Sequence, residues 1–167
     1  EKKLSLDDHV KKWLPDFTLH DPWVAKEANI RDLLCHRLGF ETFQGDFMFF
    51  DSDLTPQQVR EKFGKVEPLH SFRGQWGYTN AAFMTAGEII PKVSGQTWAE
   101  YLKEKIFTPL GMTNTLALSK DIKTAANKAA AHTVAQGVLK KIPYGNIDNL
   151  AAAGSISSSV NDMSHWV

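Results

Sequence analysis

The stretch that decides the fold is residues 72–95, which reads FRGQWGYTNAAFMTAGEIIPKVSG. Gly74 and Gly77 bracket a short turn, and an amphipathic pattern begins directly after it. Apolar residues at spacings of three and four share one face of a helix. They are Ala82, Phe83, Ala86, Ile89, Ile90 and Val93. The sequence therefore predicts a central helix that is entered through a tight, glycine-containing turn.

Tyr78 and Asn80 stand at the mouth of this helix, before the periodic pattern begins. In an extended or turn conformation, residues two apart point the same way. A phenol and a carboxamide would then project together from a rigid element, which is one way to hold polar groups in a cleft. Spacing alone favours a half-buried tyrosine whose hydroxyl finds a partner, and it also allows an asparagine that caps the helix.

Length and composition limit the possible functions. A chain of 167 residues is expected to form one domain with a sizeable core. Its 19 basic and 19 acidic residues balance, so nothing indicates a nucleic-acid groove or an anionic membrane partner. The single cysteine, Cys35, excludes an internal disulfide, and its apolar surroundings predict a buried thiol. The histidines lack metal-ligand spacing and no phosphate loop is present, so we expect neither a metal nor a cofactor.

Capping residues predict where the other helices begin. The pairs are Ser5 with Asp8, Asn29 with Asp32, Thr55 with Gln58, Thr97 with Glu100, and Ser159 with Asp162. Residues 16–28 carry little periodicity and are predicted to be a loop, whereas the alanine-rich residues 124–131 are compatible with a helix. Residues 133–144 alternate loosely around Gly137, which predicts a small hairpin. The chain is therefore expected to be mainly α.

Residues 40–54 are rich in aromatic side chains but aperiodic. Phe43, Phe47, Phe49 and Phe50 either cover a cleft or anchor a long loop, and the general tendency of aromatic rings to pack favours the anchor.

Several blocks occur in the order found in one known family. Residues 78–80 (YTN), 93–95 (VSG) and 106–112 (IFTPLGM) resemble the serine β-lactamase and penicillin-binding-protein family, and most of all its class C-like branch of β-lactamases, D-Ala-D-Ala peptidases and esterases. Residues 3–8, 30–39 and 154–163 extend the resemblance over nearly the whole chain. It implies the helical lobe of an α+β fold, with a small β-hairpin and most of the sheet missing. Residues 1–167 would then be a single partial domain.

The resemblance also implies a site. In that family an acyl-enzyme forms on the serine of a Ser-x-x-Lys motif, and a Tyr-x-Asn element and a Lys-Thr-Gly-like strand complete the machinery. Tyr78 and Asn80 match the middle element residue by residue, which implies that they are catalytic. His36 matches a structural position, and Gln44 lies in a loop that can contact substrate in class C relatives.

The other two elements do not occur in this sequence. No serine is followed three places later by a lysine, and no Lys-Thr-Gly, Lys-Ser-Gly or His-x-Gly triplet is present. We therefore expect the nucleophile upstream and the last strand downstream of this chain, and we expect the 167 residues by themselves to be inactive.

The function implied by the resemblance is part of a serine hydrolase that acts on a β-lactam, a D-Ala peptide or a small ester, in the periplasm or cell envelope. Its partner is a small-molecule or peptidoglycan-like substrate, with no nucleic acid. An inactive homologue that binds peptidoglycan or a protein partner is the alternative, and a plain helical interaction module is a third. A severed sheet would expose apolar surface, so self-association is also expected.

Overall fold

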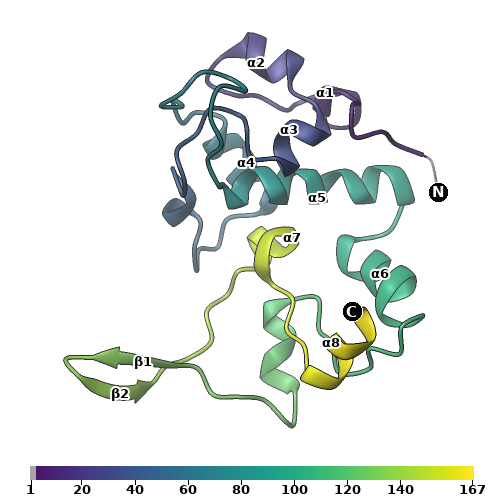
Figure 1. Cartoon of the computed structure of the whole chain (residues 1–167), viewed down its shortest axis with the longest axis vertical. Helices are drawn as coiled ribbons and strands as arrows, with labels where there is room; N and C mark the ends of the chain where they lie inside the picture. The colour runs from purple at the N-terminus through teal and green to yellow at the C-terminus, as the bar shows by residue number, and fades with distance from the viewer. Residues whose placement is uncertain (1–2) are drawn as a thin grey trace.

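The computed structural model describes residues 3–167, except for the side chain of Met48. Helix α5 (Asn80–Ser94) runs through the middle of the molecule, and several of the other helices pack against it (Figure 1). On one side lie α1 (Val10–Trp13), α2 (Pro22–Glu27), α3 (Ile30–Leu34) and α4 (Pro56–Phe63). The short helix α7 (Ala151–Gly154) packs on the opposite side of α5. This arrangement confirms the prediction of a central helix and of a mainly α chain.

Two further helices and a π-helical turn lie beyond the C-terminal end of α5 (Figure 1). Helix α6 (Trp98–Leu102) continues into a π-helical turn, η2 (Lys103–Phe107), and α8 (Val160–Trp166) is hydrogen-bonded through Asp162 to Asn114 and Thr115. Within residues 3–167, three 3-10 turns complete the helical elements: η1 (Asp46–Met48), η3 (Ser119–Thr124) and η4 (Asp148–Leu150).

The only sheet in the described part of the chain is the hairpin of β1 (His132–Ala135) and β2 (Val138–Lys141), which projects from the helical body (Figure 1). Its strands are antiparallel, with Ala135 paired to Val138 across a two-residue turn. Gln136 and Gly137 both have positive φ, 53° and 76°, which suits the right-handed twist of a hairpin. The predicted hairpin around Gly137 is confirmed.

Capping predicted most helix starts correctly. Asn29 with Asp32, Thr55 with Gln58, and Thr97 with Glu100 each form a reciprocal capping box, and Ser159 accepts a hydrogen bond from the Asp162 amide. In each case the partners are three residues apart, so the contact needs no help from the rest of the fold.

Three local predictions are wrong. Ser5 and Asp8 do not start a helix, because the backbone of residues 6–10 pairs with residues 28–31 and α1 begins only at Val10. The predicted loop 16–28 contains α2, where the Asp21 carboxylate caps the helix and Pro22 occupies its first position. Residues 125–131 form no helix, since the 3-10 turn η3 ends at Thr124.

Two predictions about burial are corrected as well. Cys35 is exposed, because α3 ends at Leu34 and the apolar periodicity does not continue through the cysteine. Phe49 is fully buried and anchors its loop as expected, but Phe43, Phe47 and Phe50 are 49%, 85% and 63% exposed. Only one of the four rings therefore belongs to the core.

Candidate active site

Tyr78 and Asn80 lie together where the chain enters α5. Asn80 is the first residue of the helix, and Thr79 precedes it in an extended conformation, so the two side chains project toward the same side. The Tyr78 hydroxyl donates a hydrogen bond of 3.1 Å to Asn80 Oδ1. Both residues are half-buried. The predicted juxtaposition of phenol and carboxamide is thus present in the fold.

Asn80 is not the cap of α5. The N-cap position belongs to Thr79, whose side chain makes no capping hydrogen bond. The carboxylate of Asp46 takes that role from a distant loop: it accepts the Asn80 backbone N–H at 3.0 and 3.2 Å and the Asn80 Nδ2 amide at 2.6 Å. A carboxylate also suits the positive end of the helix dipole. Sequence reasoning missed Asp46, because nothing in its local pattern connects it with a residue 34 positions away.

His36 lies beneath the tyrosine. Its ring is 4.6 Å from the Tyr78 ring and 5.2 Å from Phe83, between centroids, and its Nδ1 accepts the Thr79 backbone N–H at 3.2 Å. Burial lowers the pKa of His36, although the charge of Asp46 opposes this effect. The neutral imidazole is therefore a packed and hydrogen-bonded support, as the resemblance implied.

The turn before Tyr78 approaches the loop after α3 very closely. A Cβ added to Gly77 would lie 1.8 Å from the Phe40 carbonyl oxygen, so only glycine fits there. The Gly77 amide donates to His36 O at 2.9 Å, and Phe43 donates its amide to Tyr78 O at 2.7 Å. These backbone contacts hold Tyr78 from both sides.

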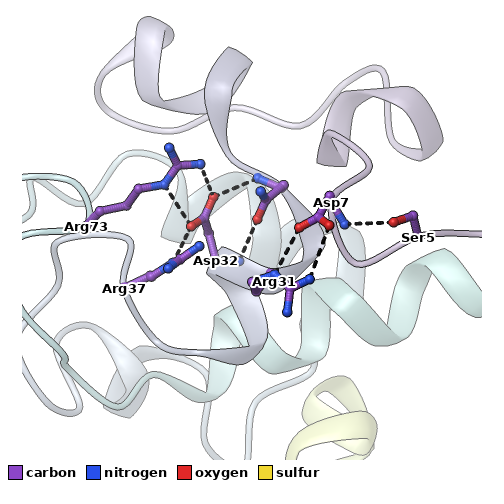
Figure 2. A network of polar contacts seen from close by, with 7 residues as sticks. Ser5, Asp7, Arg31, Asp32, Arg37 and Arg73 are labelled. Carbon is purple, nitrogen blue, oxygen red and sulfur yellow. Dashed lines mark hydrogen bonds and ion pairs between the residues drawn. The ribbon is translucent and has the colours of Figure 1, made fainter.

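A buried carboxylate ties the same turn to α3 (Figure 2). Asp32 has a fully buried side chain, and it accepts hydrogen bonds from Arg37 Nε at 2.5 Å and from Arg73 Nε and Nη2 at 3.0 and 2.8 Å. Burial alone would raise the pKa of Asp32, but the hydrogen bonds from Arg73, the Asn29 amide and Arg37 outweigh it and lower that pKa. Asp32 thus fixes Arg73, five residues before Tyr78.

Aromatic rings surround the exposed side of Tyr78. Phe43 meets it edge-to-face at 5.5 Å, and the 60% exposed Trp76 lies 6.5 Å away, between ring centroids. Gln44, the candidate substrate contact, has both ends of its amide engaged with backbone, at Glu67 O and at the Glu41 amide. Gln44 therefore holds its own loop in this structure.

One hollow of about 520 Å³ lies elsewhere, between η2 and residues 111–121, and neither Tyr78 nor Asn80 lines it. Among residues 3–167, no group of histidine, cysteine and carboxylate side chains has an arrangement that could hold a metal ion. In the same part of the chain, every helix is too short or too polar to cross a bilayer.

A family model described as Beta-lactamase matches residues 1–167. Penicillin-binding protein 4* of Bacillus subtilis is 31% identical over 121 residues, which are 67% of this chain and 25% of that protein. Unguisins hydrolase ungD′ of Aspergillus campestris is 26% identical over 161 residues, which are 90% of this chain and 29% of that protein.

A solved structure with a similar fold is the D-stereospecific amidohydrolase from Streptomyces sp., with a TM-score of 0.78 at 23% identity. The match covers 98% of this chain and 52% of the amidohydrolase. The chain therefore spans less than a third of the two relatives in sequence and about half of the protein with the similar fold.

Proposed function

The chain belongs to the beta-lactamase family, and on that premise we propose that it contributes the Tyr-x-Asn element to a serine hydrolase that forms an acyl-enzyme on an amide or ester. Its helices and small hairpin are the helical lobe of the family's α+β fold. In this proposal Tyr78 and Asn80 are the catalytic residues of the lobe, and residues 1–167 are one part of a larger domain.

The observation that carries the proposal is the 3.1 Å hydrogen bond from the Tyr78 hydroxyl to Asn80 Oδ1 at the start of α5. A half-buried tyrosine commonly finds a hydrogen-bond partner, but here the partner is a second polar side chain that projects in the same direction and is itself partly open to solvent. Here both side chains stay half-open to solvent, while His36, Asp46 and Gly77 fix their backbone. Such support is typical of residues that must meet a substrate in one geometry.

In this proposal Tyr78 and Asn80 have different roles in the acylation reaction. A serine hydroxyl is a weak nucleophile until a neighbouring base takes its proton. Tyr78 is proposed to carry that proton between the serine and the leaving group. Asn80 cannot take a proton, so its amide orients: its oxygen accepts from the phenol or from a lysine ammonium, and its NH₂ donates to a substrate carbonyl.

The nucleophile and the final strand are proposed to come from other parts of a longer protein, because this sequence contains neither motif. A β-lactam, a D-Ala peptide and a small ester are the proposed substrate classes, and the periplasm or cell envelope is the proposed location. The apolar surface left by the incomplete sheet is proposed to favour self-association of the 167-residue chain.

Acylation of the full-length protein tests this proposal. A fluorescent penicillin and a fluorophosphonate are each incubated with the protein, and the covalent adduct is weighed by mass spectrometry. Tyr78→Phe keeps the ring packed against His36 and is expected to slow acylation by about a hundred- to ten-thousand-fold. Stability should change by no more than about 1 kcal/mol.

Tyr101→Phe, which removes a phenol oxygen from α6, is the matched control and should leave the rate unchanged. The 167 residues alone serve as the blank, and an adduct on any of their serines would contradict the assignment. If the full-length protein forms no adduct with either probe, the inactive, binding homologue is the better description.

A further inference from the structure

Asp46 is a loop residue whose side chain binds the first residue of α5, Asn80. It lies at the start of η1, its side chain is buried, and its carboxylate contacts both the backbone and the side-chain amide of Asn80. The 2.6 Å bond to Nδ2 is shorter than the ordinary N–H···O distance of about 2.9 Å, as is usual when the acceptor is charged.

The two ends of a carboxamide have nearly the same shape, so only its hydrogen-bonding partners distinguish one orientation from the flipped one. An ionised carboxylate accepts and cannot donate. With Asp46 on one side, the NH₂ end of Asn80 must face the carboxylate, and Oδ1 must then face the Tyr78 hydroxyl, as observed.

We propose that Asp46 is a positioning residue that sets the orientation of the Asn80 carboxamide. This inference rests on the proposed function of Tyr78 and Asn80. Asp46 occupies one of the two Nδ2 hydrogens, which leaves the other for a substrate carbonyl, and it presents Oδ1 toward the proton-carrying groups. If the amide flipped, Oδ1 would point at the carboxylate and the site would lose both its acceptor and its donor.

Capping of α5 is the competing explanation for the same contacts. Asparagine and aspartate are about equally good at the N-terminus of a helix, so Asp46→Asn keeps a group that accepts the Asn80 backbone N–H. The new carboxamide has only one oxygen, however, and turns its own NH₂ toward the side chain of Asn80. The variant therefore preserves the cap but favours the flipped orientation of the Asn80 amide, with Oδ1 toward residue 46.

The test is a double-mutant cycle in the full-length protein, with a fluorescent penicillin and p-nitrophenyl acetate as probes. Asp46→Asn is expected to lower kcat by about tenfold to a hundredfold, with KM within about threefold, because a displaced catalytic group costs rate more than binding. In a protein that already carries Asn80→Ala, the same substitution should lower kcat by less than about threefold. Asp53→Asn, an exposed aspartate of the same loop with the same change of charge, should leave kcat unchanged.

Each result of this experiment either supports or overturns the proposed role of Asp46. An equal effect of Asp46→Asn with and without Asn80 shows that Asp46 does not act through the amide, and overturns the inference. So does a melting temperature lowered by more than about 10 °C, which would mark a structural cap. If Tyr78→Phe slows acylation and Asp46→Asn does not, only the positioning role fails. If neither substitution slows it, the proposed function fails too.

Discussion

Replacing Asp32 with asparagine tests whether the buried carboxylate holds the turn that leads to Tyr78. The Asp32 side chain is fully buried, whereas the side chains of Arg37 and Arg73 are 35% and 44% exposed. Asp32→Asn removes the charge and one acceptor oxygen, and it turns an NH₂ group toward an arginine.

Breaking a buried ion pair by removing one partner costs about 3 to 5 kcal/mol. Both arginines can turn toward water when the carboxylate is lost, so we expect the lower end, a loss of about 3 kcal/mol of unfolding free energy. For a chain of this size, that corresponds to a melting temperature lowered by about 6 to 12 °C. Circular dichroism at 222 nm during heating measures it, and urea unfolding gives the free energy directly.

The matched control is Asp7→Asn (Figure 2). Asp7 also binds an arginine through two hydrogen bonds, from Arg31 at 2.9 and 3.2 Å, but the Asp7 side chain is 67% exposed, whereas that of Asp32 is fully buried. Solvent screens such a pair, so we expect no measurable loss of stability. Equal losses for the two variants would refute the argument that burial makes the Asp32 network strong.

The pH dependence provides a second check on the same residue. The folded pKa of Asp32 lies below its ordinary value. Its contribution to stability is therefore complete above the unfolded pKa of about 3.9 and is lost as the pH falls through the folded pKa. The free-energy difference between the wild-type protein and Asp32→Asn should stay constant from about pH 8 to pH 5 and shrink below about pH 4. A difference that persists unchanged at pH 3 would contradict the ionic explanation.

Two further substitutions test the support around Tyr78. Gly77→Ala places a Cβ against the Phe40 carbonyl, so we expect a loss of at least about 2 kcal/mol in urea unfolding, and a neutral result would mean that the two segments are not packed this closely. His36→Asn keeps an acceptor for the Thr79 amide and tolerates the positive φ of 55°. Because burial lowers the pKa of His36 in the folded state, stability should fall as the pH drops below about 6.5 in the wild-type protein and fall less in His36→Asn. Parallel curves between pH 7 and pH 5 would refute this role.

Local patterns in the sequence determined much of the helical framework. The capping boxes at Asn29, Thr55 and Thr97 form as predicted, because each joins residues three apart within a single turn of chain. The juxtaposition of Tyr78 and Asn80 has the same cause, since two residues that flank an extended Thr79 point the same way whatever surrounds them. Contacts of this range can be inferred from spacing alone.

The tertiary structure decided what surrounds that pair. Asp46 reaches Asn80 across 34 positions, and Asp32 reaches Arg73 across 41, and no periodicity connects either pair in the sequence. The tertiary structure also decided which side chains are exposed to solvent. Cys35 is more exposed than its apolar neighbourhood suggested, and so are three of the four phenylalanines between residues 43 and 50. A one-dimensional pattern records which residues share a face of one helix, but long-range pairing depends on how loops close in space. That closure is set by the packing of the whole chain around α5.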